Sequence, residues 1–196
     1  MAETTYDVAT IVAAGGALLR VGALLAGLLR SIRRRKRFTA LKLGAAEALM
    51  VPEGPLLGVI AVLLLLDRTG DPTTVEAIAA VAGALIGLLG LDMLLWTLRS
   101  WHELFVGHGV LEGQSLVTGG AYGFVRHPVY LAALLVWAGV SLAFLSVVTA
   151  LVTIFYVLPA YLLYIRSEEK MMVEAFGDPY EDYRRSVPML VPRTWG

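Results

Sequence analysis

The sequence predicts an all-α fold, a polytopic membrane helical bundle with about five transmembrane helices. Hydrophobic residues make up 58% of the 196 residues and charged residues only 16%, with a mean hydropathy of +0.72. Soluble domains carry a smaller apolar share than this. The apolar residues also gather in runs close to the roughly 20 residues that a helix needs to cross a bilayer. We therefore expect a chain that lies in the membrane, with little left for a separate soluble domain.

The first three expected spans cover residues 8–29, 43–66 and 75–98. A basic block, residues 30–37, follows the first span and is typical of a cytoplasmic flank, so the N-terminus is expected outside. Pro52 removes a backbone donor and should bend or interrupt the second span. Gly83 and Gly87 have GxxxG spacing, which lets another helix approach closely, either within the chain or in a second copy.

Residues 129–165 are apolar over 37 positions. As one helix they would run about 55 Å, nearly twice the hydrocarbon thickness, so we expect a hairpin with its turn near residues 145–147. The polar segments on either side, residues 99–126 and 166–196, then lie in the cytoplasm. Of the 16 Lys and Arg residues this topology leaves only Arg68 outside, as flanking charge requires for a protein of the cell inner membrane.

Composition excludes several kinds of site. The formal net charge is zero, so no basic field favours nucleic acid, and the absence of cysteine excludes disulfides and thiolate metal ligands. His102, Glu103 and His108 lie in a glycine-rich segment without a defined ligand geometry, so we expect no metal site. We expect residues 1–98 to form a unit of three spans and residues 99–196 to form the catalytic core.

The hairpin has a direct consequence for function. Its two cytoplasmic ends, residues 126–128 and 166–169, should lie about one helix spacing apart. Pro128 suits the first turn of a helix, whose N-terminal end favours anions. Glu168 and Glu169 are turned about 100° from each other on a helix, which predicts different roles for the two carboxylates.

Three short motifs occur together in this half of the chain: G-A-Y-G-F-V-R-H-P-V-Y at 120–130, R-S-E-E at 166–169 and F-G-D-P-Y-E-D-Y at 176–183. A V-P-x-x-x-P pattern follows at 187–192. Together they resemble the isoprenylcysteine carboxyl methyltransferase family and its prokaryotic relatives over residues 116–193. The R-H-P-x-Y part alone is shared with membrane sterol reductases and would be weak evidence.

The resemblance implies an S-adenosylmethionine-dependent methyltransferase whose cofactor pocket faces the cytoplasm and opens sideways to lipid. By position it assigns the cofactor to Tyr122, His127, Pro128, Tyr130, Glu168 and Glu169, and catalysis to Arg126, Arg166 and Glu169. The expected methyl acceptor is lipophilic: the carboxylate of a prenylated cysteine, another lipid, an amine or a small hydrophobic acid. A sulfonium methyl is already activated, so the protein mainly has to align the acceptor and exclude water.

Two other functions remain open at this point. An NADPH-dependent membrane reductase of sterols or other lipids would share R-H-P-x-Y, and a non-enzymatic membrane scaffold would explain the GxxxG spacing. Ionisable residues within apolar spans are costly and usually paired or functional; those of this chain are Arg20, Glu47, Glu53 and Asp92. We expect Arg20 to pair with Glu53, and Asp92 to share a face with Trp96 near a substrate entrance or to reach the interface.

Overall fold

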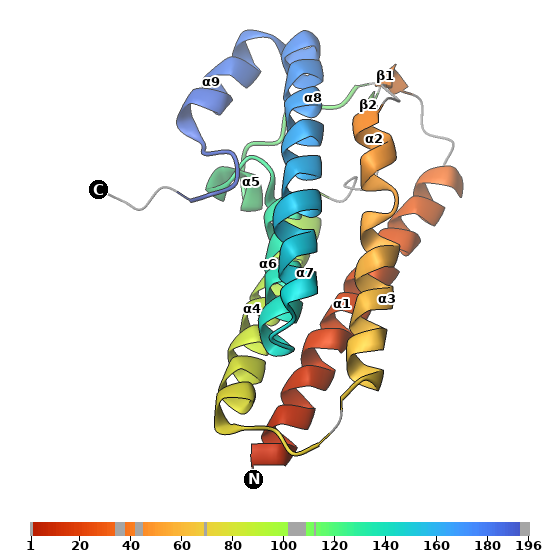
Figure 1. Cartoon of the computed structure of the whole chain (residues 1–196). Helices are drawn as coiled ribbons and strands as arrows, with labels where there is room; N and C mark the ends of the chain where they lie inside the picture. The colour runs from red at the N-terminus through yellow and green to blue at the C-terminus, as the bar shows by residue number, and fades with distance from the viewer. Residues whose placement is uncertain are drawn as a thin grey trace.

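The computed structural model describes residues 2–33, 38–41, 45–68, 70–101, 109–111 and 113–192. Its long helices run roughly alongside one another in an elongated bundle, with the N-terminus at one end and the C-terminal helices at the other (Figure 1). These long helices are α1 (Ala2–Arg33), α3 (Glu53–Leu66), α4 (Thr74–Ser100), α6 (Pro128–Ala143) and the continuous helix made by α7 (Val147–Val152), η1 (Thr153–Val157) and α8 (Leu158–Phe176). The predicted all-α bundle is confirmed.

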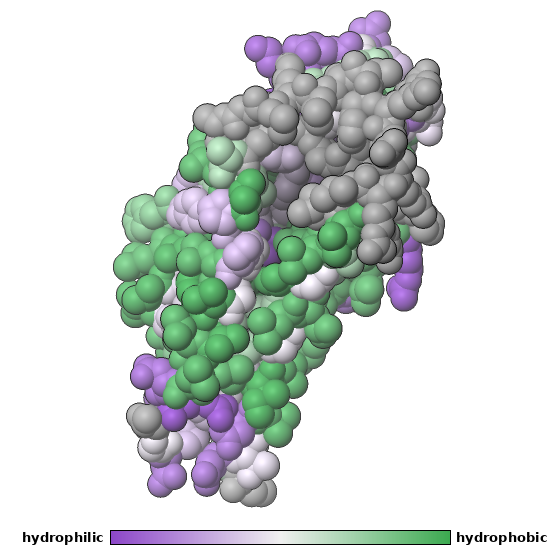
Figure 2. All heavy atoms as spheres, turned by 90° about the vertical axis from the view of Figure 1, so that its right-hand side faces the viewer, coloured by the Kyte–Doolittle hydropathy of each residue, from purple (hydrophilic) through white to green (hydrophobic). Residues whose placement is uncertain are grey.

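In the part of the chain that the structure describes, four helical stretches are long and apolar enough to cross a membrane: Ala2–Gly27, Ala48–Leu66, Thr74–Ser100 and Val147–Phe176. The fifth expected span, α6, is apolar but has only 16 residues, about 24 Å of helix. On the face seen in Figure 2, apolar side chains cover the middle of the molecule, and hydrophilic ones gather toward its two ends. The architecture is that of an integral membrane protein.

The second span is interrupted as Pro52 predicts. Helix α2 (Ala45–Met50) ends before this proline, and α3 starts directly after it at Glu53. The sequence did not predict the short antiparallel pairing of β1 (Phe38–Leu41) with β2 (Gly109–Leu111), in which Ala40 faces Val110. This pair joins the segment after α1 to the segment after α4.

The glycines of α4 pack within the chain. A Cβ atom on Gly83 would lie 2.3 Å from the backbone nitrogen of Ala143, and one on Gly139 would lie 2.6 Å from that of Gly87. Because both positions meet backbone atoms, no side chain can move aside to make room. The small residues therefore set the distance between α4 and α6, and the GxxxG spacing serves this interface.

The hairpin turns where the sequence predicts it. Leu145 adopts a positive φ of 44°, and the Ser146 hydroxyl accepts a hydrogen bond from the backbone of Thr149 at the start of α7. The outgoing arm continues without interruption to Phe176, where Gly177 (φ 59°) ends it and α9 (Asp178–Ser186) begins. This arm therefore carries Glu168 and Glu169 on the same rigid helix that crosses the membrane.

Candidate active site

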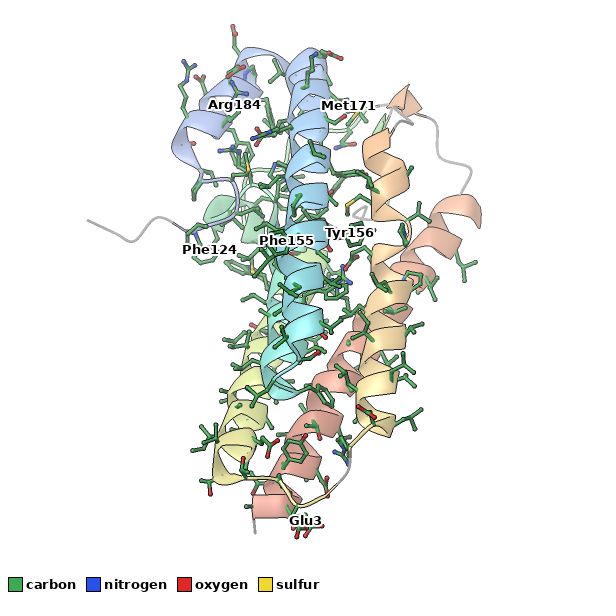
Figure 3. The ribbon with its side chains drawn as sticks, viewed as in Figure 1. Glu3, Phe124, Phe155, Tyr156, Met171 and Arg184 are labelled. Atoms are coloured by element: carbon green, nitrogen blue, oxygen red, sulfur yellow. The ribbon has the colours of Figure 1, made fainter. Side chains whose placement is uncertain are left out.

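The hairpin brings together the two polar clusters at its ends. Arg126 and His127 stand immediately before α6, and Glu168 and Glu169 lie on α8, the helix that also carries Met171, which is labelled in Figure 3. The His127 Nε2 to Glu169 Oε1 distance is 3.1 Å, across 42 residues of sequence. The predicted juxtaposition of these two clusters is confirmed.

Glu169 is the centre of this cluster. Its Oε1 atom accepts from Arg126 Nε at 2.8 Å and lies 2.7 Å from Arg126 Nη2. The side chains of both residues are over 90% buried, with 8% and 9% exposed, so water screens the pair little. Charge-assisted bonds in such surroundings are strong and hold the carboxylate in one orientation.

The third nitrogen of Arg126 binds backbone. Nη1 donates to the carbonyl oxygen of Arg184 at 2.9 Å and to that of Val187. In the same place the N–H groups of Arg126 and His127 donate to the carbonyl oxygens of Pro188 and Met189, at 2.8 and 3.2 Å. The Arg126 guanidinium therefore holds both α8 and residues 184–187 against the start of α6.

His127 is buried between the two carboxylates. Its Nδ1 lies 3.5 Å from Glu168 Oε2, while its Nε2 contacts Glu169. Burial lowers the pKa of His127, but hydrogen bonding and the negative charges of Glu168 and Glu169 outweigh that effect and raise the pKa above its usual 6.5. The two carboxylates therefore favour the protonated form of the imidazole more than water would.

Glu168 contacts aromatic side chains as well as His127. The Tyr130 hydroxyl donates to Glu168 Oε2 at 3.1 Å, and the Tyr130 ring stacks on His127 with centroids 5.8 Å apart. The rings of Tyr161 and Tyr164 on α8 also pack against the Tyr130 ring, with centroid distances of 5.2 and 5.8 Å. The two glutamates do point to different surroundings, as their helical offset predicts.

Tyr122 lies on the short helix α5 (Ala121–Phe124). The residue before this helix is Gly120, and no other residue type fits its conformation and surroundings. Gly120 has φ 63°, and a Cβ atom there would lie 2.3 Å from the Ser100 Oγ, which itself accepts from the N–H of Ala121. The Tyr183 hydroxyl donates to the Tyr122 carbonyl at 2.7 Å. Burial, followed by the charge of Glu168, raises the pKa of Tyr122, so its phenol stays protonated at neutral pH.

The remaining sequence candidates lie elsewhere. Arg166 is exposed and has no ion pair with any residue in the described part of the chain, so the structure does not bring it to Glu169. Asp92 is exposed on α4, and Trp96, 40% exposed, contacts Phe124 with ring centroids 5.8 Å apart. His102, Glu103 and His108 fall outside the described residues, as does the Glu47 side chain.

Sequence reasoning missed the role of the chain end. The carbonyl groups of residues 187–189 bind the backbone and side chain of the R-H-P motif, and Tyr180 and Tyr183 of α9 are buried. The V-P-x-x-x-P pattern was the available signal. These contacts use backbone carbonyl groups, which every residue type has. The sequence pattern therefore could not show that residues 187–189 bind Arg126 and His127.

A second buried polar cluster was predicted only as a pair. Arg20 of α1 contacts Glu53 of α3 at 2.9 Å (Nη2 to Oε2), which confirms the expected pairing. The same Nη2 donates to the Tyr161 hydroxyl at 3.0 Å, and the Trp137 indole N–H donates to Glu53 Oε1. We name these four residues the Arg20 cluster. It joins α1, α3, α6 and α8 within the apolar core.

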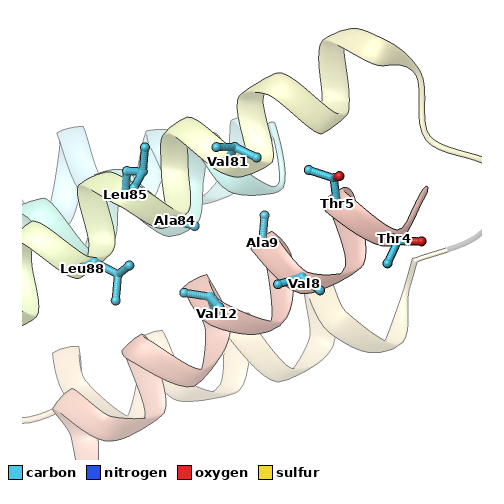
Figure 4. Close-up of a pocket in the computed structure, with 9 residues that line it drawn as sticks. All are labelled: Thr4, Thr5, Val8, Ala9, Val12, Val81, Ala84, Leu85 and Leu88. Atoms are coloured by element: carbon cyan, nitrogen blue, oxygen red, sulfur yellow. The ribbon is translucent and has the colours of Figure 1, made fainter. Parts of the chain in front are cut away.

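A groove opens at the opposite end of the bundle, between α1 and α4. Its walls are mainly apolar, with Val8, Val12, Leu85 and Leu88 among the lining side chains (Figure 4). Thr4 and Thr5, near the N-terminus, bring hydroxyl groups to it. Among the described residues, its lining contains no acid, base or cation for chemistry.

Comparison with known proteins agrees with the geometry. The family model described as phospholipid methyltransferase matches residues 78–179, just over half of the chain. The chain belongs to the phospholipid methyltransferase family. The matched stretch includes most of α4, the hairpin and both glutamates of the site.

Named relatives extend the comparison. Methanethiol S-methyltransferase 2 of Bradyrhizobium diazoefficiens is 40% identical over 100 residues, covering 50% of this chain and 37% of that protein. Protein-S-isoprenylcysteine O-methyltransferase of Schizosaccharomyces pombe is 37% identical over 78 residues, covering 39% of this chain and 33% of that protein. The chain therefore spans about a third of the length of these two curated relatives. The resemblance to the isoprenylcysteine carboxyl methyltransferase family is confirmed.

A longer but weaker match has a different name. Nickel-cobalt-cadmium resistance protein NccN of Alcaligenes xylosoxydans xylosoxydans is 27% identical over 135 residues, covering 69% of this chain and 62% of that protein. Among the residues that the structure describes, no three His, Asp or Glu side chains gather in a way that could hold a metal ion.

Proposed function

We propose that this chain is an integral membrane methyltransferase that uses S-adenosylmethionine and transfers its methyl group to a lipophilic acceptor. The observation that carries the proposal is the cluster of Arg126, His127 and Glu169, whose side chains are buried, with the partly exposed Glu168 beside them, where the start of α6 meets α8. This cluster lies inside the stretch that matches a methyltransferase family. The named methyltransferase relatives support the same activity.

The side chains of the site fit the chemical groups of this cofactor. Carboxylates accept hydrogen bonds from amino and hydroxyl groups, and both carboxylates and aromatic faces favour a nearby cation such as a sulfonium. Glu168 and the rings of Tyr122 and Tyr130 offer these groups. Pro128, at the first turn of α6, presents a helix N-terminus that suits the amino-acid carboxylate of the cofactor.

When bound, S-adenosylmethionine supplies an activated methyl group, so the protein needs no covalent nucleophile. The residues of this chain have to bind the two reactants, orient them in line and keep water out. Glu169 binds cofactor and orders the site, and Arg126 and His127 fix its carboxylate. We assign Arg126 to positioning because all three of its nitrogens have protein partners.

The two halves of the chain have different tasks in this proposal. Residues 99–196 hold the cofactor, and residues 1–98 supply the walls that contact the lipophilic acceptor. The exposed ring of Trp96 on α4 contacts the exposed ring of Phe124, which lies on the same short helix as Tyr122, and an acceptor from the bilayer could enter there. Arg166 is exposed on α8, one turn before Lys170, and is available to contact the acceptor from outside the buried cluster.

The proposal is tested by titration calorimetry of detergent-purified protein with S-adenosylmethionine, S-adenosylhomocysteine and NADPH. We expect micromolar binding of both adenosyl ligands and at least a tenfold loss in Glu169→Gln, which keeps the shape of the side chain but removes its charge. Glu174→Gln makes the same change at an exposed position of α8 and should bind like wild type.

Each outcome separates the candidate functions. Loss of binding in Glu169→Gln with retention in Glu174→Gln would support the site and justify a screen of lipid acceptors. Binding of NADPH alone would favour a membrane reductase. No binding of any of the three ligands would leave a structural role for the cluster.

A further inference from the structure

The Arg20 cluster is a charged group in the middle of an apolar core. Arg20 and Glu53 are 4% and 3% exposed, and Trp137 and Tyr161 are fully buried. Their neighbours in the core include Ala17, Leu57 and Val140. A buried ion pair is a weak source of stability, because well-packed apolar side chains in its place are often as stable or more so. The cluster therefore calls for an explanation beyond holding four helices together.

Hydrogen bonding in the cluster is incomplete at one atom. Arg20 Nη2 serves both Glu53 and Tyr161, whereas Arg20 Nη1 is buried and has no hydrogen-bond partner among the described residues. A buried donor without a partner is costly and rare. Arg68 Nε is likewise buried and without a partner among those residues, but the Arg68 side chain as a whole is 24% exposed and pairs with Asp7 at the far end of the bundle. The Arg20 side chain is only 5% exposed.

Two aromatic residues, Tyr161 and Tyr130, connect Arg20 to the proposed active site. The Tyr161 hydroxyl binds Arg20, the Tyr161 ring contacts Tyr130 at 5.2 Å, and the Tyr130 hydroxyl binds Glu168. Tyr161 precedes Glu169 by eight residues on α8, which corresponds to about 12 Å of helix. That separation is comparable to the length of a small molecule, so the two polar clusters can hold different parts of one reactant pair.

We propose that Arg20 binds the carboxylate of a lipophilic acid, which is the methyl acceptor, inside the membrane-embedded part of the bundle. This inference rests on the proposed methyltransferase function. Glu53 fixes the guanidinium through Nη2, and the Trp137 indole fixes Glu53, so Nη1 is held ready for an incoming oxygen. In a medium of low dielectric constant, this bond to an anion is strong.

The same geometry distinguishes substrate from product. In the transfer, a carboxylate oxygen forms a bond to the methyl carbon as the carbon–sulfur bond of the sulfonium breaks. The electron pair of that bond stays on sulfur, and no proton moves. The product is a neutral methyl ester, which offers Arg20 only a carbonyl oxygen. Loss of the charge weakens the contact and favours release of the ester into the bilayer.

The test uses the full chain in detergent micelles at pH 8 and two matched probes, palmitate and methyl palmitate. These probes have the same acyl chain and the same carbonyl group, but only palmitate is charged. The readout is the ¹⁵N-indole resonance of Trp137, whose N–H donates to Glu53; the resonance is assigned by its loss in Trp137→Phe. We expect a saturable shift with palmitate and at least tenfold weaker binding of methyl palmitate.

The matched variant removes both charges together. Arg20→Met alone would leave the buried Glu53 carboxylate unpaired and could unfold the protein. Arg20→Met combined with Glu53→Gln avoids this and keeps an acceptor for the Trp137 indole. We expect this double variant to bind palmitate at least tenfold more weakly than wild type, while its S-adenosylhomocysteine binding, which reports that it is folded, is retained. Arg185→Lys, at an exposed position of α9, should keep the affinity for palmitate.

The outcomes separate this inference from the function on which it rests. Equal shifts with the two probes, palmitate binding that survives in the double variant, or no shift at all in wild type would overturn the role of Arg20. S-adenosylhomocysteine binding is measured on the same samples by calorimetry. If wild type binds it and ignores palmitate, only the inference fails; if wild type does not bind it, the methyltransferase function fails whatever palmitate does.

Discussion

Arg126 uses the whole planar shape of its guanidinium group. Nε and Nη2 bind Glu169, and Nη1 binds backbone carbonyl groups near the chain end. A lysine ammonium is a compact charge on a flexible stem and cannot make these contacts together. We expect Arg126→Lys to lose about 1–3 kcal/mol of the interactions that order the site. S-adenosylhomocysteine binding should weaken by about 10–100-fold, as measured by calorimetry.

The control for this prediction is Arg185→Lys. Arg185 is 73% exposed and pairs with Asp182 within one turn of α9. Such surface pairs contribute little. Equal binding by Arg126→Lys and Arg185→Lys would contradict the positioning role of Arg126.

The raised pKa of His127 predicts how the stability of the protein depends on pH. Its folded pKa is raised above 6.5, because the hydrogen bonds and charges of Glu168 and Glu169 outweigh its burial. A raised pKa means that the stabilisation is fully present below the unfolded pKa of about 6.5 and is lost as pH rises through the folded value. The thermal unfolding midpoint in detergent should therefore fall as pH rises above 6.5. His127→Gln should show less of this fall; parallel curves for the two proteins would refute the assignment to His127.

At the scale of elements, the contact between α4 and α6 depends on the absence of side chains. A methyl group on Gly139 would meet the backbone of Gly87 at 2.6 Å. We expect Gly139→Ala to destabilise the protein by about 1–3 kcal/mol, the usual cost of overpacking. The control is Gly15→Ala on α1, where a Cβ atom meets nothing within 4 Å and where alanine favours the helix.

The measurement is the temperature at which half of the protein remains monodisperse in size-exclusion chromatography after heating in detergent. Gly139→Ala should lower this temperature, and Gly15→Ala should leave it unchanged or raise it. Comparable losses in both variants would mean that the α4–α6 contact is looser than these distances imply.

Prolines illustrate which elements the sequence predicts and which it does not. Pro52 stands at a helix break that its missing N–H makes predictable. Pro159 lies inside the continuous helix from Val147 to Phe176, just after the π-helical segment Thr153–Val157. The wider turn of that segment is where the helix absorbs the proline. Whether a proline breaks or widens a helix depends on the packing around it, which the sequence pattern does not contain.

At the scale of the molecule, hydropathy and helix length predict most of the architecture. The length of the run at 129–165 requires a hairpin, and the hairpin brings Arg126 and His127 to Glu168 and Glu169. The β1–β2 pair was missed because three or four residues are too few to show a period. Of the four residues in the Arg20 cluster, the sequence predicted only the ion pair. Tyr161 and Trp137 are typical core aromatic residues by sequence, and only the structure shows that their polar groups bind Arg20 and Glu53.

The orientation of the whole molecule in the membrane is predicted by its charge. Glu3 lies at one end of the bundle and Arg184 at the other (Figure 3). The basic residues of α8 and α9 lie toward the end that carries Arg184. Arg68 lies beside Asp7 at the end that carries Glu3. Arg20 belongs to neither end, because it is buried within the bundle. Cytoplasmic flanks are enriched in Lys and Arg, so we expect the N-terminus outside and the active site inside.

The absence of cysteine makes this orientation directly testable. Glu3→Cys and Asp182→Cys each introduce a single thiol at an exposed position, one at each end of the bundle. In intact spheroplasts, a membrane-impermeant maleimide should label Glu3→Cys, whereas Asp182→Cys should react only after the membrane is permeabilised. The reverse pattern would place the glutamate cluster outside, away from the cytoplasmic pool of S-adenosylmethionine. Orientation therefore bears on the proposed chemistry as well as on the fold.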